Sequence, residues 1–408
     1  MNWTSDTIAC GMHADWRQRL SDQLASNPSI SESLDDVVDS LRNGEHLSFE
    51  QGLKLWNHCD LSEIAHLAHI CKTARFGDDV FFNSNLHVNQ TNICTLACKF
   101  CAFRRGPKAK DAYALDQQQF IERIRPFEHI IDELHTVGGL HPDWDITYYE
   151  DLFAALKNQF PHIHIKSLSA VEVKHIAEVS GMSARSLLSR LQKAGLDSLP
   201  GGGAEILDDE VRNIICYGKE TADEYIQIHR DAHAIGMPTN CTMLFGTVET
   251  PEQRIAHLCK LRELQDETSG FQCFVPYPYL PDNSRLPEAQ LASGSEVLRM
   301  IAISRLMLDN IPHIKAYRMN IGDRLSEIAL HHGADDFDGT VGHEEIMHEA
   351  GSDTIVGYTK SELMKFIIDA KGIPVQRNSI YTKFKRYDDD EDPYQSMIQL
   401  PLVPSSGE

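Results

Sequence analysis

Eight short apolar segments alternate with longer amphipathic segments along the middle of the chain, and this alternation constrains the fold more than any other feature. Such alternation is typical of parallel β-strands joined by helices. Eight repeats predict an α/β fold, a (β/α)8 barrel of the TIM type, complete or nearly so. A doubly wound sheet is the alternative. The predicted strands lie within residues 83–89, 133–139, 163–169, 196–202, 240–246, 271–277, 313–319 and 333–339.

The segments on either side of this barrel have different patterns. Residues 1–75 have the apolar spacing of helices. We expect the barrel to occupy residues 76–345, and residues 346–408 to form a helical extension that ends in an acidic tail. Within the barrel, Gly195 is expected to end one helix and Thr250 to cap the start of another.

The overall charge restricts the classes of partner. The 408-residue chain has a formal net charge of −22. A surface this acidic repels nucleic acid and anionic lipid, so we expect neither as a partner, although a local basic pocket for a small anion remains compatible with it. No apolar run is long enough to span a bilayer, and residues 1–20 lack the basic and apolar regions of a secretory signal. We therefore expect a cytoplasmic location, where thiols stay reduced.

Three of the ten cysteines fall within eight residues, directly after the first predicted strand: Cys94, Cys98 and Cys101. The C-x3-C-x2-C spacing lacks the second cysteine pair of a structural zinc site, and a redox CxxC motif would leave Cys94 unexplained. Three thiolates can hold three irons of a [4Fe–4S] cluster, with the fourth iron left open for chemistry. The alternatives are three coincidental thiols or a zinc site completed by His87.

The cysteine loop, "NICTLACKFCAF", has an aromatic residue before its last cysteine and resembles the cluster loop of the radical S-adenosylmethionine (SAM) enzymes. The resemblance extends from about Asn85 to about Tyr381. The segments "VGGLHPD", "AGLDSLPGGGAEIL", "LRELQDETSGFQCFVP" and "GADDFDGTV" are similar to the aminofutalosine synthase branch, which serves menaquinone biosynthesis. Its nearest relatives are the cyclic dehypoxanthine futalosine synthases and the tyrosine-using enzymes of deazaflavin synthesis.

This resemblance implies a radical enzyme with a [4Fe–4S] cluster that consumes SAM as a co-substrate. One electron would release a 5′-deoxyadenosyl radical, which in this branch adds to the enol ether of 3-[(1-carboxyvinyl)oxy]benzoate. Rearrangement and loss of carbon dioxide would give aminofutalosine. A one-electron donor, flavodoxin or ferredoxin, is implied as a partner. A related radical cyclase or carbon–carbon-forming enzyme remains an alternative, as does a non-catalytic iron–sulfur or zinc protein.

The same resemblance implies the residues that bind the cofactor. Gly138 and Gly139 match the superfamily's glycine pair, whose backbone approaches the methionine amino group. Phe100 is expected to pack beside the cluster or the adenine, unless it is a plain core residue. Glu205 would accept from the ribose hydroxyls, and the alternative is a glutamate that complements a helix dipole. Ser169 would contact the cofactor or merely cap the next helix.

The implied substrate carries two carboxylates, so its pocket should offer cations or strong donors. His87, Lys315 and Arg318 lie at predicted strand ends and are the candidate substrate-binding residues. His141 adjoins the glycine pair and is the candidate catalytic residue, although most of the chain's 20 histidines must be structural or surface residues.

Three positions depart from the pattern expected of this branch. Thr247 stands where we expect histidine, and Arg318 stands where we expect tryptophan. The segment 275–286, which contains Tyr277 and Tyr279, replaces an expected Pro-Leu-Ala-Phe-His-Pro. Because these positions lie on predicted strand ends that would face the substrate, a paralogue with another acceptor remains an alternative.

Overall fold

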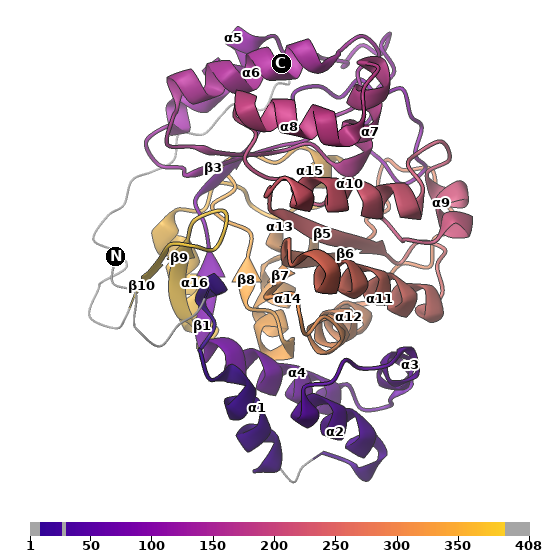
Figure 1. Ribbon diagram of the computed structural model, residues 1–408, viewed down its shortest axis with the longest axis vertical. Coiled ribbons are helices and arrows are strands. Elements are labelled where there is room, and N and C mark those ends of the chain that lie inside the picture. Colours follow the sequence, from indigo (N-terminus) through magenta and orange to yellow (C-terminus); the bar gives the residue numbers. More distant parts are fainter. Residues whose placement is uncertain (1–8, 27–29, 388–408) are drawn as a thin grey trace.

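The structure is a computed structural model that describes residues 9–26 and 30–387. Its centre is a set of strands enclosed by helices (Figure 1). The strands form a seven-stranded sheet in the order β10-β9-β1-β8-β7-β6-β5 and a three-stranded sheet in the order β2-β3-β4. Their bounds are β1 (Asp79–Phe82), β2 (Asn85–His87), β3 (Glu133–Thr136), β4 (His164–Ser167), β5 (Thr239–Phe245), β6 (Phe271–Pro278), β7 (His313–Ala316), β8 (Asp336–Phe337), β9 (Ile373–Arg377) and β10 (Phe384–Arg386).

The two sheets together follow the course of a TIM-type barrel. β1 and β2 are nearly consecutive in the chain; β1 pairs in parallel with β8, and β2 pairs in parallel with β3. Two isolated parallel bridges, Lys166–Ser198 and Leu199–Thr239, connect β4 to β5. The predicted fold is confirmed, except that Ser198 and Leu199 make single bridges where a complete fourth strand was expected.

Helices cover the outside of these strands, and two of their ends follow the local sequence. In α11, Thr250 accepts from the backbone of Gln253 and Pro251 opens the first turn. In α8, Gly195 is the C-cap at a φ of 124°. Both predicted helix ends are confirmed. The covering helices are α5 (Gln117–Ile124), α6 (Ile146–Gln159), α7 (Ala170–Val179), α8 (Ala184–Ala194), α9 (Asp209–Ile215), α10 (Ala222–Ala234), α11 (Pro251–Thr268), α12 (Gly294–Met307), α13 (Arg318–Ile321) and α14 (Asp323–Ala329), with 3-10 turns at Arg125–Phe127 and Leu330–His332.

The segment before the barrel is helical, as predicted, over its described residues. α4 packs against α12 of the barrel and against α1, whereas α3 contacts α11 and α12 directly. The N-terminal helices lie below the strands in Figure 1. These helices are α1 (Trp16–Ala25), α2 (Asp35–Asn43), α3 (Phe49–Asn57) and α4 (Leu61–Phe76), with 3-10 turns at Ala9–Gly11 and Glu32–Leu34.

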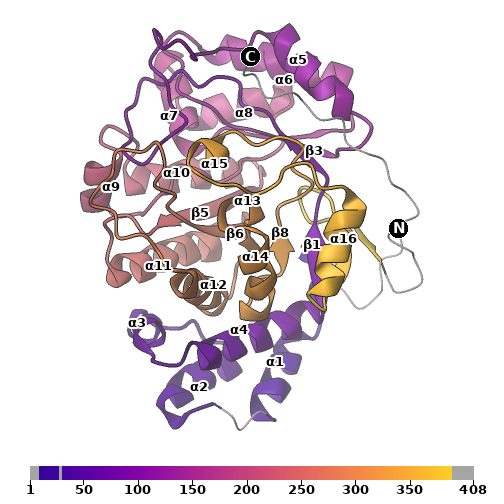
Figure 2. The ribbon, with the colours of Figure 1, turned by 180° about the vertical axis from the view of Figure 1, so that it is seen from behind.

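The segment after the barrel is not wholly helical, which corrects the prediction for residues 346–408. It contains the short helix α15 (Ile346–Glu349) and the helix α16 (Lys360–Asp369), which lies beside β1 in Figure 2. It then adds β9, parallel to β1, and β10, antiparallel to β9. The predicted acidic tail lies almost entirely beyond residue 387, outside the described residues. The division into three domains stays a prediction.

Candidate active site

One cavity of about 280 Å³ collects most of the candidate residues. Its walls come from the strands and from the loops that follow them, the place where barrels of this type carry their chemistry. Nine of the twelve candidates line it: His87, Cys94, Cys98, Phe100, Cys101, Gly138, Ser169, Glu205 and Lys315. Gly139, His141 and Arg318 are not among the lining residues.

The cysteine loop directs all three thiols to this cavity. The backbone N–H of Cys94 donates to the carbonyl of Arg105 at 3.0 Å, and that of Cys101 donates to the carbonyl of Cys98 at 3.3 Å. Burial raises the pKa of the Cys98 and Cys101 thiols, so a bound cation is needed to favour their thiolates. The loop therefore supplies three sulfurs that are suited to metal binding.

The arrangement of these sulfurs argues against a single-ion site. Among residues 9–26 and 30–387, no three His, Cys, Asp or Glu side chains converge as ligands of one metal ion. His87 and the three cysteines therefore do not converge on one point in this structure. A [4Fe–4S] cluster is consistent with this finding, because each of three cysteines binds a different iron and the sulfurs need not meet at one point.

The glycine pair has two separate roles. The N–H of Gly138 donates to Glu172 at 3.0 Å, and Gly138 lines the cavity. Gly139 packs against the cysteine loop: its N–H donates to the Thr91 carbonyl at 2.8 Å, and a Cβ there would collide with the carbonyl of Ile93. Glycine is required at position 139 for this close approach of two backbones.

Glu172 accepts four hydrogen bonds in this region, and the sequence interpretation missed it. Its side chain is buried and accepts from Gly138, from Gln90 at 2.8 Å, and from the N–H and hydroxyl of Ser169 at 2.7 and 2.6 Å. Burial raises the pKa of Glu172. Because Ser169 and Glu172 form a capping box at the start of α7, the Ser-x-x-Glu pattern looked like local helix chemistry alone.

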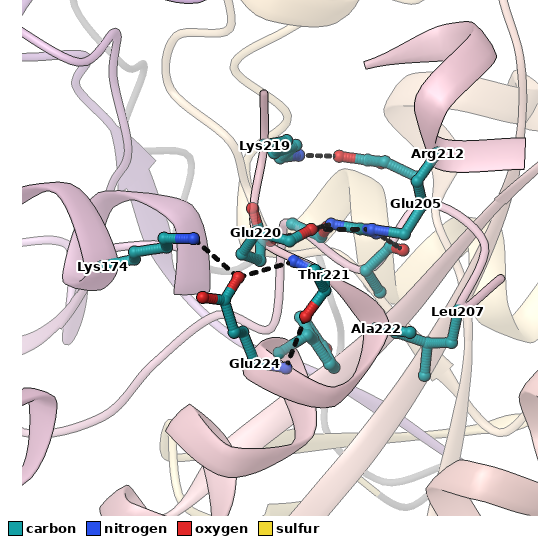
Figure 3. A network of polar contacts seen from close by, with 12 residues as sticks. Lys174, Glu205, Leu207, Arg212, Lys219, Glu220, Thr221, Ala222 and Glu224 are labelled. Carbon is teal, nitrogen blue, oxygen red and sulfur yellow. Dashed lines mark hydrogen bonds and ion pairs between the residues drawn. The ribbon is translucent and has the colours of Figure 1, made fainter. Parts of the chain in front are cut away.

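Glu205 lies in the loop after the three glycines and forms an ion pair with Lys219 (Figure 3). Both side chains are buried, and the Lys219 ammonium lies 5.6 Å from the centroid of the Phe100 ring. Arg212 stabilises the glycine loop by donating hydrogen bonds to the carbonyls of Gly203 and Ala204. We call Cys94, Cys98, Cys101, Gly138, Glu205 and Lys219 the cysteine end of the cavity.

The other part of the cavity, which we call the lysine end, contains His87, Glu133, His135, Lys166 and Lys315. The Lys166 ammonium lies 2.7 Å from a Glu133 oxygen, and the Lys315 ammonium lies 3.2 Å from Asp336. Burial lowers the pKa of His135 to about 4 and that of His87 well below its usual value, so both imidazoles are neutral at pH 7. The two lysines are therefore the cations of this end.

Two of the predicted site residues, His141 and Arg318, do not line the cavity. The His141 ring stacks on Trp144 with centroids 4.4 Å apart, outside the cavity lining. Arg318 is fully buried, donates to Asp323 and to the Ile355 carbonyl at 3.0 Å each, and does not line the cavity. The catalytic role of His141 and the substrate-binding role of Arg318 therefore stay predictions that the cavity lining does not support.

Only one of the three departures from the expected pattern reaches the cavity. Tyr277 lines it. The Thr247 hydroxyl donates to Glu249 at 2.6 Å and is fully buried away from the lining. Tyr279 contacts Ser284 and lines a smaller neighbouring pocket.

Comparison with known proteins identifies the family. Residues 88–260 match the family model described as the radical SAM superfamily, and residues 268–389 match the model described as the CofH/MqnC C-terminal region. The aminodeoxyfutalosine synthase of Thermus thermophilus is 39% identical over 357 residues, which cover 86% of this chain and 96% of that protein. The chain belongs to the radical SAM superfamily.

Other relatives lie in the same branch of radical SAM enzymes. The aminodeoxyfutalosine synthase of Streptomyces coelicolor is 40% identical, over 86% of this chain and 94% of that protein. The cyclic dehypoxanthine futalosine synthase of the same organism is 35% identical, over 87% of this chain and 90% of that protein. The resemblance inferred from the motifs is thus confirmed, and the protein is a radical SAM enzyme that uses a [4Fe–4S] cluster and SAM.

Solved structures support the fold independently. Methylornithine synthase superposes with a TM-score of 0.67 at 17% identity, over 82% of this chain and 96% of that one. The FeFe-hydrogenase maturase HydG of Carboxydothermus hydrogenoformans gives a TM-score of 0.68 at 17% identity, over 90% of this chain and 85% of that one. Within the part of the chain that the structure describes, no helix is both long enough and apolar enough to cross a membrane.

Proposed function

We propose that this radical SAM enzyme transfers the 5′-deoxyadenosyl group of SAM to the enol ether of 3-[(1-carboxyvinyl)oxy]benzoate and releases carbon dioxide, giving aminofutalosine for menaquinone biosynthesis. The observation that carries the proposal is the higher identity to aminodeoxyfutalosine synthases, 39–40%, than to the cyclic dehypoxanthine futalosine synthase, 35%, over similar lengths. The departure at Tyr277 is the one that bears on the choice of acceptor, because Tyr277 lines the cavity.

The cysteine end is suited to the cofactor. Cys94, Cys98 and Cys101 would hold the cluster; with SAM bound there, the pair supplies the adenosyl group after one-electron cleavage of a carbon–sulfur bond. The ammonium and sulfonium of SAM are cations, and the nearby carboxylates of Glu172 and Glu205 would stabilise them. Glu205 keeps Lys219 as its partner, so it would offer the ribose hydroxyls its remaining oxygen.

The lysine end is suited to the acceptor. Lys166 and Lys315 would bind carboxylates of the benzoate derivative, and the neutral imidazoles of His87 and His135 would contribute hydrogen bonds without adding charge. Val275 and Tyr277 also line the cavity and provide apolar contacts for an aromatic ring.

Cys101 would give the electron a route from the surface to the cluster. This residue lines both the main cavity and an outer depression. Three arginines, Arg104, Arg105 and Arg285, line the depression together with one carboxylate, Glu349, which pairs with Arg105. We propose this basic depression as the docking face for an acidic carrier, flavodoxin or ferredoxin. Arg285→Glu should slow turnover driven by flavodoxin and leave turnover driven by dithionite unchanged. Equal rates for wild type and variant with flavodoxin would contradict the proposed face.

Product analysis tests the proposed reaction. The anaerobically reconstituted enzyme is reduced with SAM and the enol ether, and the products are separated by mass spectrometry. A product that retains the adenosyl carbons, together with carbon dioxide, supports the proposal. Unchanged SAM in the presence of the enol ether contradicts it.

The same assay also tests a second reaction type, because residues 268–389 match a region named for other members of the branch. A cyclase or carbon–carbon-forming enzyme uses the radical only to abstract hydrogen. Free 5′-deoxyadenosine, formed with an acceptor of the cyclase or deazaflavin type and absent with the enol ether, identifies that alternative.

A further inference from the structure

A continuous group of buried charges lies behind the lysine end. Arg377, at the end of β9, donates to both oxygens of Asp336, at 2.5 and 2.9 Å. Asp336 on β8 also accepts from the Tyr381 hydroxyl at 3.0 Å and lies 3.2 Å from the Lys315 ammonium. Side chains of Arg377 and Asp336 have no exposed surface. Arg377 of β9 therefore pairs with the same carboxylate that contacts Lys315.

The ionisation of these groups is well determined by their neighbours. Against the opposing effect of burial, Arg377 and Lys315 hold the pKa of Asp336 below its usual value. In the same way, Lys166 and Arg377 hold the pKa of Glu133 well below its usual value. Asp336 is the neighbour that contributes most to raising the pKa of Lys315 against the effect of burial. Burial lowers the pKa of Lys166, and the contact with Glu133 opposes this effect. In their usual ionised forms, all five groups carry a charge.

The sum of these charges is not zero. Lys166, Lys315 and Arg377 contribute +3, whereas Glu133 and Asp336 contribute −2, which leaves +1 in a buried region. An uncompensated buried charge is unfavourable unless a partner of opposite sign is present. Only Lys166 and Lys315 among the three cations line the cavity, so the excess positive charge is available there.

We infer that Arg377 is a positioning residue: it neutralises Asp336 from outside the cavity, so that Lys315, together with Lys166, keeps a free positive charge for one carboxylate of the acceptor. The forked guanidinium of Arg377 is matched to the two oxygens of Asp336, and Tyr381 occupies a further acceptor position. Each lysine ammonium has three donors, and its contact with Glu133 or Asp336 needs only one. This inference rests on the proposed carboxylate substrate.

Besides Glu133 and the carboxyl groups near the cysteine end, Asp338 and Glu344 line the cavity, and burial disfavours their negative charge. Burial raises the pKa of Asp338, and it raises that of Glu344 to about 7. Both groups are therefore easier to protonate than ordinary carboxyls. Glu344 also accepts from the backbone N–H of Met347 at 2.8 Å, which gives it a partner of its own.

A charge-restoring pair of substitutions tests the inference. Benzoate, a simple aromatic carboxylate, is titrated calorimetrically into the full-length, cluster-loaded protein at fixed ionic strength. Arg377→Gln lowers the sum to zero and should weaken benzoate binding by about tenfold or more, as expected for loss of a charged partner. Arg377→Gln with Asp336→Asn restores +1 and should return the Kd to within about threefold of wild type.

Arg305 provides a matched control. It pairs with Asp335, next to Asp336, is fully buried, and donates to the Gly333 carbonyl at 2.8 Å, but neither partner lines the cavity. Arg305→Gln should lower the melting temperature and leave the benzoate Kd unchanged. An equal loss of benzoate affinity in Arg305→Gln and Arg377→Gln would mean that Arg377 acts only through stability.

The remaining outcomes also decide the question. An unchanged Kd in folded Arg377→Gln contradicts the inference, and so does a double variant that binds as weakly as the single one. If Arg377→Gln does not fold, the double variant, which leaves no carboxylate at position 336 without its arginine, decides by its own Kd: a value within about threefold of wild type supports the inference, and a value about tenfold or more weaker contradicts it. Because benzoate binding needs no turnover, the charge pattern can hold even if the enol ether proves to be the wrong acceptor.

Discussion

The cysteine end and the lysine end of the cavity use buried charge in opposite ways. At the cysteine end, Glu205 is paired with Lys219, and the nearby Glu172 is held only by neutral donors. At the lysine end, Lys166 and Lys315 pair with Glu133 and Asp336, and Arg377 adds a third cation behind the cavity wall. The first arrangement is suited to a cationic sulfonium cofactor and the second to an anionic acceptor. One cavity can therefore orient two ligands of opposite charge without a change in shape.

The largest expected effect is loss of the cluster. Cys98→Ala removes one of three iron ligands and should abolish both the visible absorption of the cluster and turnover. Cys216→Ala is the matched control, since Cys216 is an equally buried thiol that does not line the cavity. Its cluster absorption should equal that of wild type. A Cys98→Ala protein that keeps its cluster would show that Cys98 is not a ligand.

The substitution Glu172→Gln tests whether a carboxylate near the cysteine end is needed to bind SAM. The amide has about the same size as the carboxylate. It removes the negative charge of the group that accepts hydrogen bonds from Gly138 and Ser169. We expect SAM binding to weaken about tenfold or more, because hydrogen bonds to charged groups contribute about 1.5–3 kcal/mol. Equilibrium dialysis with labelled SAM measures this. Glu178→Gln, on the exposed side of the same helix, should bind SAM normally.

Lys315→Met should have the complementary effect. Asp336 keeps its two bonds to Arg377, so the substitution leaves no unpaired buried carboxylate. The KM for the acceptor should rise about tenfold, whereas the Kd for SAM should stay within about twofold of wild type. If SAM affinity falls as much as acceptor affinity, the two ends are not independent.

The smallest effect concerns pH and the neutral histidines of the lysine end. Burial lowers the pKa of His135 to about 4, against about 6.5 in the unfolded chain. The unfolded state therefore binds more protons between these values, and the stabilisation present above pH 6.5 is lost as the pH falls. At pH 5 this one group should cost about 2 kcal/mol. Urea unfolding at pH 7 and pH 5 should show a smaller decrease for His135→Gln than for wild type; identical decreases would contradict the assignment.

Much of this site could be predicted from the sequence. The cysteine spacing, the glycine pair and the strand ends placed nine candidate residues in one cavity. Glu172 was missed because a capping box explains Ser-x-x-Glu locally, and only the fold shows that Gly138 shares the same carboxylate. Lys166 was missed because the alternation within residues 163–169 does not show which face points into the barrel.

His141 and Arg318 show the limit of predicting a site from strand ends. A position at a strand end indicates proximity to the site but not the direction of the side chain. His141 turns onto Trp144, and Arg318 turns into a buried pair with Asp323. The role of β9 was also beyond the sequence, because Arg377 is 41 residues from its partner Asp336 and lies in a segment expected to be helical.

The central claim is that the cysteine end carries a cluster with one iron open to SAM. Mössbauer spectroscopy of the anaerobically reconstituted, iron-57-labelled protein, with and without SAM, tests this most directly. We predict a [4Fe–4S] cluster in which the signal of one iron changes when SAM is added. Four irons whose signals are unaffected by SAM, or zinc in place of iron, would contradict the account.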